Sequence, residues 1–379
     1  MKKVLAVVLT LAMALSLAAC GGAASSQAAA PAESKEEAAP ASSEAAAPAE
    51  ESKAEEAPAE EAAPAEEAAA EEDLTQGDKI QINLASTFPA EGFVHQCFVY
   101  AKEEIEEKTG GRIEVIIHPA DALGSTKEIV EGVKEGTIEA SGIGDEDLDT
   151  YAPSYSVFSM PYLYRDKEHY IATLREFSKE GGLFDQVADI TGQYSFAWVL
   201  RGARDVTANK EIMEPGDLAG LKFRLPQAPA RIAMFEAYGA SPTVVDFSEL
   251  YMALKTGTVD AQENPPETIY TYKYYEAQKY LILTEHMFSP ARVTVSKVWF
   301  DKLDPKDQKV IREAFNNATE RTLEENPDPD QEYLKLCEEE GMTLVTPNKQ
   351  AFIDQAAPVV AKWAEDNWEP GLLDIINGL

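Results

Sequence analysis

The chain is poor in the residues on which metal sites, disulfide frameworks and most catalytic centres depend. Only three cysteines and four histidines occur in 379 residues. The sequence has no H-E-x-x-H pair, no G-x-S-x-G elbow and no phosphate-binding P-loop. His95 lies two residues from Cys97, but no further metal-ligating residues cluster there. We therefore expect no metal and no cofactor, and binding is favoured over catalysis.

The cysteines leave their pairing open. Apart from Cys20, only Cys97 and Cys337 remain, and outside the membrane they could form one disulfide. Their separation in sequence does not decide the question, because a disulfide depends on the distance between the two Cα atoms. Unpaired, partly buried thiols are favoured.

Basic residues are scarce. The chain has 33 lysines and arginines against 67 acidic residues, which gives a formal net charge of -34. A surface this acidic argues against nucleic acid or anionic lipid as a partner. It does not exclude a small anionic ligand, because a single well-placed arginine can dominate the local field.

Only one long apolar run occurs, and it lies at the start of the chain. Lys2 and Lys3 precede an almost uninterrupted apolar-to-small run over residues 4–19. The run is shorter than a membrane span of ~20 residues, so we predict a secretory signal peptide over residues 1–19. Leu17-Ala18-Ala19-Cys20 resembles a bacterial lipobox, in which Cys20 becomes the lipidated first residue. An ordinary cleaved signal with an incidental cysteine is the alternative.

Residues 20–77 predict a flexible tether behind this anchor. They consist almost entirely of Ala, Glu, Pro, Ser and Gly. Such a segment buries too little apolar surface to offset the entropy of ordering, and its prolines interrupt short helical turns. The folded part would therefore be held off the outer face of a membrane.

Residues 78–379 alternate between strand and helix patterns. Ser125 and Glu128 form a capping-box pattern at the start of one helix. Strands are expected at 80–84, 112–118, 194–200, 220–226, 243–245, 293–298 and 342–345, and helices at 94–108, 125–139, 230–238, 247–255, 265–280, 304–325, 331–340 and 349–367. Residues 326–330 should break the long helix. The alternation indicates an α/β fold with a parallel-rich sheet.

Several motifs occur in one order along this part. They are Ala122–Gly124, Phe158-Ser-Met-Pro-Tyr162, Asp217-Leu-Ala-Gly-Leu-Lys-Phe-Arg-Leu-Pro226, Tyr238-Gly-Ala-Ser-Pro-Thr243, Phe247–Leu254 and Gly257–Pro265. Together they resemble the TRAP-transporter solute-binding proteins, the DctP-like family, over nearly all of residues 78–370. The resemblance implies a two-lobed, periplasmic-binding-protein-like α/β fold (class II type) with hinge strands and a long lobe-connecting helix. Its layout gives one lobe from 78–201 plus 290–329 and another from 202–289 plus 330–379.

The resemblance also implies a function. Such a protein is an extracytoplasmic receptor that captures a small organic acid, closes around it and delivers it to a TRAP membrane permease, without catalysis. A receptor for an ATP-driven permease or a sensor kinase is the first alternative. A secreted lipoprotein hydrolase and a cell-envelope interaction module are the others.

The resemblance assigns solute-binding roles to particular residues. Arg224 matches the carboxylate-binding arginine, and a guanidinium suits this role because two parallel N–H groups fit both carboxylate oxygens. A strand arginine in a surface ion pair is the alternative for Arg224. Arg204 matches a second arginine, with Arg201 as a nearby competitor. Asn264 matches an amide that touches the carboxylate or orients the first arginine.

Other pocket assignments follow from the same comparison of motifs. Phe247 matches a pocket aromatic residue, and Phe88 is a candidate aromatic wall at the entrance. Asp145 or Glu146 would meet a cationic or hydroxyl group of the solute, whereas a solvated acidic face is the plainer interpretation. Glu263 is expected to support the structure. Four tyrosines crowd one predicted helix and are expected mostly to pack: Tyr270, Tyr272, Tyr274 and Tyr275.

Overall fold

The computed structural model describes residues 73–379 except 146–147 and 180. These residues belong to one compact unit that begins at Ala69. The predicted signal peptide, Cys20, most of the predicted tether and Glu146 lie outside the described residues.

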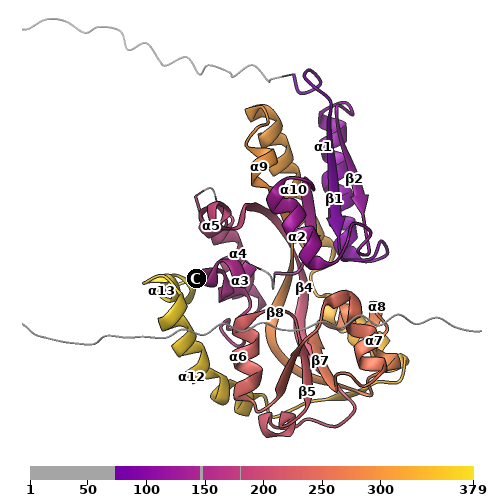
Figure 1. The fold of residues 1–379 in the computed structure, drawn as a ribbon, viewed down its shortest axis with the longest axis vertical. Helices are drawn as coiled ribbons and strands as arrows, with labels where there is room; N and C mark the ends of the chain where they lie inside the picture. Colours follow the sequence, from indigo (N-terminus) through magenta and orange to yellow (C-terminus); the bar gives the residue numbers. More distant parts are fainter. Residues whose placement is uncertain (1–72, 146–147, 180) are drawn as a thin grey trace, which may run out of the picture. The chain divides into compact units, whose positions relative to one another are not determined.

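A single mixed sheet organises this unit (Figure 1). Its strand order is β2-β1-β3-β8-β4-β7-β5-β6, and β9 pairs with β8. Neighbouring strands are parallel at both ends of this order, whereas β3–β8, β8–β4 and β4–β7 are antiparallel. The strands are β1 Ile80–Ser86, β2 Ile113–His118, β3 Ala140–Ile143, β4 Gln193–Ala208, β5 Lys222–Leu225, β6 Ser241–Val244, β7 Ala261–Asn264, β8 Tyr280–Ser296 and β9 Thr343–Val345.

Helices connect and cover these strands. The α-helices are α1 Phe93–Lys108, α2 Thr126–Glu135, α3 Leu148–Tyr151, α4 Lys167–Phe177, α5 Leu183–Thr191, α6 Pro229–Ala237, α7 Leu250–Lys255, α8 Pro266–Thr271, α9 Lys297–Phe300, α10 Pro305–Glu325, α11 Pro329–Glu339, α12 Lys349–Asn367 and α13 Leu372–Asn377. Four short 3-10 helices add η1 Pro153–Phe158, η2 Pro215–Leu218, η3 Phe247–Glu249 and η4 Tyr274–Glu276.

The two central strands are much longer than the sequence predicted. β4 and β8 pair along nearly their whole length, with register shifts near Ser195, Leu200 and Arg204. Such bulges bend and twist a ladder locally. The predicted strands covered only residues 194–200 and 293–298 of these two long strands. In the structure β4 continues because its polar side chains from Arg201 to Thr207 are buried, and β8 begins with the apolar run Tyr280–Leu283, with Glu285 as its one exposed residue.

Separate apolar clusters lie along the central pair. One is formed by α1, α10, β1–β3 and the early part of β4. Another contains α4–α6, β5 and α12, and a third packs α7, α8, η4 and β9. The predicted long helix is confirmed as α10, which packs against α1 and β4. The second of these clusters joins residues that precede the middle of β4 to residues that follow it, so this core is shared by segments that were predicted to lie in different lobes.

Several helix predictions needed correction. The capping box of Ser125 and Glu128 is present, but α2 ends at Glu135 because Gly136 takes a left-handed conformation with φ 79°. The helix predicted over 265–280 is broken, since Lys273 adopts a positive φ of 57° between α8 and η4. The short helix α13 was not predicted.

The cysteine prediction is confirmed in its main point. Cys97 and Cys337 are free thiols. Both are fully buried rather than partly buried, and they lie in different apolar clusters.

The first described residues contact the folded part. The Leu74 carbonyl accepts a hydrogen bond from Arg112 Nε at 2.9 Å, and the Gln76 carbonyl accepts one from Lys306 Nζ at 2.7 Å. Arg112 is itself held by a buried ion pair with Asp307. The end of the predicted tether is therefore attached to this part of the chain.

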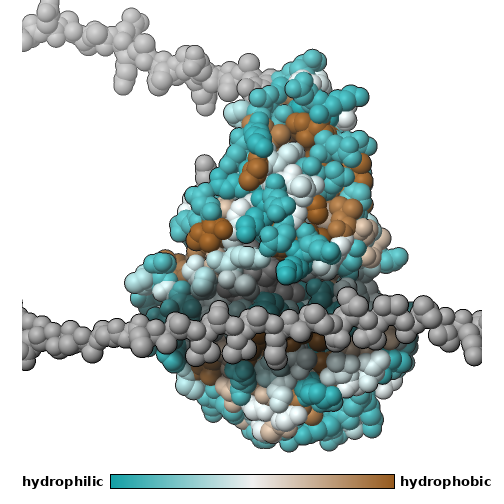
Figure 2. Space-filling view, in the orientation of Figure 1, coloured by the Kyte–Doolittle hydropathy of each residue, from teal (hydrophilic) through white to brown (hydrophobic). Residues whose placement is uncertain are grey.

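Hydrophilic residues dominate the visible surface. On the face shown in Figure 2, outside the grey atoms, apolar residues form separate patches among polar ones. Over residues 73–379, leaving out 146–147 and 180, no helix combines the length and apolar character needed to cross a membrane.

Candidate functional site

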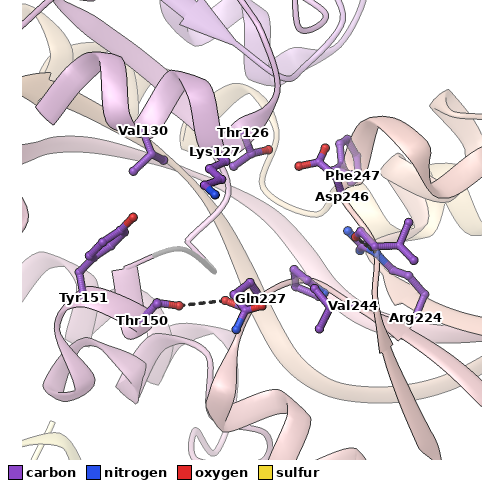
Figure 3. Close-up of a pocket in the computed structure, with 12 residues that line it drawn as sticks. Thr126, Lys127, Val130, Thr150, Tyr151, Arg224, Gln227, Val244, Asp246 and Phe247 are labelled. Carbon is purple, nitrogen blue, oxygen red and sulfur yellow. Dashed lines mark hydrogen bonds between the residues drawn. The ribbon is translucent and has the colours of Figure 1, made fainter. Parts of the chain in front are cut away.

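A pocket of about 480 Å³ lies between two groups of elements. One wall comes from α2 and α3, and the other comes from β5, β6 and the start of η3 (Figure 3). Its volume falls within the range of small-molecule sites. The lining residues are Thr126, Lys127, Val130, Thr150, Tyr151, Arg224, Pro226, Gln227, Val244, Val245, Asp246 and Phe247.

Arg224 forms part of the second wall. It is the third residue of β5, and only 2% of it is exposed. Its Nε donates a hydrogen bond to the Val245 carbonyl at 2.9 Å, which fixes the plane of the guanidinium. Because the side chain is buried at a pocket wall, an exposed surface ion pair does not describe it.

Phe247 lies on the same wall as Arg224 (Figure 3). Its ring meets that of Tyr272 edge-on, with centroids 4.8 Å apart. The preceding residue, Asp246, accepts hydrogen bonds from Ser248 N at 3.0 Å and Ser248 Oγ at 2.8 Å. This cap fixes the turn that presents the aromatic ring beside the arginine.

A buried ionic network lies on the neighbouring strands β4, β7 and β8. Arg204 forms an ion pair with Glu263 and donates to Asn264 Oδ1 at 2.9 Å and Ser289 Oγ at 3.1 Å. Glu263 also contacts His286 Nε2 at 3.2 Å. Burial alone raises the pKa of Glu263, but Arg204, His286 and a further arginine outweigh it and hold this pKa well below its usual range. Glu263 is thus an anionic anchor, as expected.

The further arginine is Arg231 on α6, which sequence reasoning missed. Its Nη2 donates to Asp145 Oδ1 at 3.1 Å, and its Nη1 lies 3.5 Å from Glu263 Oε1. Asp145 also accepts a bond from Ser159 Oγ at 3.2 Å. Asp145 is completely buried, so its interpretation as part of a solvated acidic face is wrong.

Arg201 and Phe88 form another buried contact. The guanidinium carbon of Arg201 lies 4.9 Å from the centroid of the Phe88 ring. Arg201 also donates to Thr268 Oγ1 at 3.1 Å and to Ser289 Oγ at 2.6 Å. Phe88, only 3% exposed, supports this arginine rather than lining the pocket.

Direct hydrogen bonds join segments that were predicted to lie in different lobes. Thr150 Oγ1 donates to the Gln227 carbonyl at 3.0 Å, a bond drawn in Figure 3. Tyr272 Oη donates to the Thr87 carbonyl at 2.5 Å. These bonds tie together the two sides between which the pocket lies.

The structure brings the predicted residues together unevenly. Arg224 and Phe247 line the pocket, whereas Arg204, Asn264 and Asp145 belong to the buried network. Lys127, Tyr151, Gln227 and Asp246 line the pocket but were missed. Gln227 and Asp246 follow or precede a recognised motif by one residue, so this proximity was a usable signal. No local signal marked Lys127 or Tyr151.

Metal ligands do not gather anywhere in the part of the chain that the structure describes. No group of three or more His, Cys, Asp or Glu side chains is placed there to hold an ion.

The described part of the chain is thus an α/β unit that holds a pocket with a buried arginine in one wall. Comparison with known families defines it further. Residues 84–366 match the family of bacterial extracellular solute-binding proteins, family 7 (DctP), and the chain belongs to this family.

Individual relatives agree with this assignment. The 2,3-diketo-L-gulonate-binding periplasmic protein of Escherichia coli is 31% identical over 252 residues, covering 66% of this chain and 76% of that protein. A TRAP periplasmic solute-binding protein from a Bradyrhizobium species, in complex with D-galacturonate, is 29% identical with a TM-score of 0.75, covering 79% of this chain and 100% of that one. One from Roseobacter denitrificans with bound L-galactonate is 28% identical with a TM-score of 0.71, covering 80% and 99%.

These comparisons confirm the predicted family and fold class, and solute binding as the function. The family consists of extracytoplasmic receptors that work with membrane permease components, so the chain belongs to a family of receptors rather than of enzymes.

Proposed function

We propose that this protein captures a hydroxylated organic acid by its carboxylate and that Arg224 is the main carboxylate ligand. The observation that carries the proposal is a buried guanidinium, held in a fixed plane, in the wall of the pocket. A guanidinium in such a site can donate two parallel N–H bonds to one carboxylate, which an ammonium group cannot do.

The ligands of the relatives support the choice of solute class. D-galacturonate, L-galactonate and 2,3-diketo-L-gulonate are all sugar acids with one carboxylate and several hydroxyl groups. The pocket here offers matching groups, with Thr126, Thr150 and Gln227 as hydrogen-bonding side chains and Phe247 as an apolar wall.

The remaining predicted site residues are proposed to act around this core. Arg204 is proposed as a second solute-binding arginine, and Asn264 as an amide that touches the carboxylate or orients Arg224, while Glu263 holds Arg204 in place. Asp145 fixes Arg231, and Phe88 supports Arg201. Glu146 is proposed to contact a cationic or hydroxyl group of the solute.

The lobes are proposed to follow the predicted boundaries, 78–201 plus 290–329 and 202–289 plus 330–379. The register shift of β4 near Leu200 supports a boundary at this point, because a bulge is where a paired strand bends most readily. The pocket is lined from both proposed lobes, so solute binding would favour their closed arrangement.

The cellular setting is proposed from the sequence. Lipidation at Cys20 and the acidic, proline-rich tether would anchor the receptor to the outer face of the membrane. There it would deliver its solute to a TRAP-type permease.

The proposal is tested by isothermal titration calorimetry with D-galacturonate and L-galactonate. Arg224→Lys keeps the positive charge but loses the two parallel N–H groups that fit a carboxylate, so the affinity for either acid should fall about tenfold or more. Arg175→Lys is the matched control, because Arg175 pairs with Glu320 on the exposed surface. The control should bind as the wild type does. Equal affinity of Arg224→Lys and wild type, or no binding of either acid by the wild type, contradicts the proposal.

A further inference from the structure

Tyr274 carries a buried hydroxyl that forms no hydrogen bond with the residues that the structure describes. The residue opens η4 and is completely buried. Burial of a hydroxyl without a partner is costly, so such a group calls for a ligand or another explanation.

Aromatic contacts place Tyr274 on the arginine side of the pocket. Its ring centroid lies 6.0 Å from that of Tyr272, which in turn lies 4.8 Å from that of Phe247 in the pocket wall. Tyr274 and Phe247 belong to the same apolar cluster. Tyr274 therefore belongs to the cluster against which the Phe247 wall of the pocket packs, together with Val245, whose carbonyl accepts the hydrogen bond from Arg224.

The charges around Tyr274 are those of the proposed carboxylate site. Burial raises the pKa of its hydroxyl, and the positive charges of Arg224, Arg204 and Arg201 partly oppose this rise, while Glu267 adds to it. The phenol therefore stays protonated at neutral pH and is available as a donor. Arg224, Arg204 and Arg201 thus all act electrostatically on this hydroxyl.

We propose that Tyr274 is a specificity-determining residue whose hydroxyl donates a hydrogen bond to the solute carboxylate held by Arg224. This inference rests on the proposed function, because it needs an anion at the arginine site. A carboxylate oxygen accepts several hydrogen bonds, so a phenol and a guanidinium can bind the same group.

The proposal predicts opposite effects on the free and the bound protein. Tyr274→Phe removes the hydroxyl and keeps the ring. In the ligand-free protein it deletes an unpaired buried polar group, so the melting temperature should stay unchanged or rise by about 2 °C. In the complex it deletes a hydrogen bond to a charged group, so affinity should fall about tenfold.

Tyr170 offers a matched control. Its hydroxyl is also completely buried and has no hydrogen-bond partner among the described residues. It lies in a different apolar cluster, near Asp145 and Arg231 rather than Arg224. Tyr170→Phe should therefore change the ligand-free melting temperature as Tyr274→Phe does, but leave affinity within about twofold of wild type.

The experiment measures melting temperatures without ligand and calorimetric affinities for D-galacturonate and L-galactonate in the wild type, Tyr274→Phe, Tyr170→Phe and Arg224→Lys. Weakened binding by Tyr274→Phe with an undiminished melting temperature supports the role. Weakened binding by Arg224→Lys with unchanged binding by Tyr274→Phe overturns the Tyr274 role alone. Unchanged binding by both variants, or none by the wild type, overturns the proposed function as well. Equal losses in both Tyr→Phe variants also overturn the role.

Discussion

Gly202 offers a quantitative test of how the two central strands are held. It lies in β4 with a φ of +97°, a region that L-residues rarely adopt. A Cβ at this position would lie 1.7 Å from Asp330 Oδ1. Asp330 Oδ2 accepts a hydrogen bond from Ala203 N at 2.9 Å, so the carboxyl caps the bulge immediately beside the glycine.

Gly202→Ala should therefore be strongly destabilising. The unfavourable backbone conformation costs roughly 1–2 kcal/mol. Displacement of Asp330 removes its hydrogen bond to Ala203 and adds about 1.5–3 kcal/mol. Together we expect the free energy of unfolding to fall by about 2.5–5 kcal/mol, measured by urea unfolding followed by circular dichroism.

Gly341 separates the two contributions. Its φ of +98° is nearly the same, but a Cβ there would meet nothing within 4 Å. Gly341→Ala should therefore cost only the backbone term of about 1–2 kcal/mol. In addition, Asp330→Ala should cost much less in the Gly202→Ala background than in wild type, because the clash is relieved. Equal losses for Gly202→Ala and Gly341→Ala, or additive effects with Asp330→Ala, would refute the reasoning.

Two further predictions concern buried ionisable groups. Burial raises the pKa of Asp330 to about 7 from the ordinary 3.8, so the native protein holds this proton more tightly than the unfolded chain. The free energy of unfolding of wild type, relative to that of Asp330→Asn, should fall as pH rises from about 4 to 7 and then level off. Urea unfolding at a series of pH values measures this difference between the two proteins, and a difference that does not change with pH would contradict the prediction. Burial raises the pKa of both Cys97 and Cys337 to about 12, so iodoacetamide should label these thiols only after unfolding. Peptide mass spectrometry measures the labelling, and a label on either cysteine in the native protein would disprove the prediction.

Local signals in the sequence predicted most of the peripheral elements. Ser125 and Glu128 mark the start of α2 through a capping box that the structure contains. Asp304 and Pro305 mark the start of α10, which ends at the predicted residue. These signals depend only on residues that are neighbours in the sequence, so they predict helix ends without any knowledge of the tertiary structure.

The central strands could not be predicted in the same way. Arg201, Arg204 and Asp205 look like loop residues because charged side chains are rarely buried. In the fold, partners from β7, β8 and α8 compensate Arg201 and Arg204, and Asp205 accepts a hydrogen bond from Glu285 N at 2.8 Å. Tertiary pairing therefore reverses the local preference.

The residues of the candidate site also fall into a predictable group and an unpredictable group. Arg224 and Phe247 were found because each lies within a motif of the family. The pairing of Arg231 with Asp145 brings together residues 86 positions apart, and no pattern in the sequence connects them. Residues that line a pocket from separate walls become visible only when the walls are placed.

The continuous pairing of β4 with β8 constrains how the protein can be divided or engineered. The elements at either end of the sheet pack on different stretches of the same two strands. A gene fragment that encodes only one end would therefore leave backbone N–H and C=O groups of β4 or β8 without their hydrogen-bond partners. Chimeras that exchange halves with a relative would need both crossing segments from one parent. If the proposed lobes open and close, the paired strands β4 and β8 must bend, because both strands run through both proposed lobes. A substitution that stiffens this strand pair should therefore slow both the entry and the release of solute.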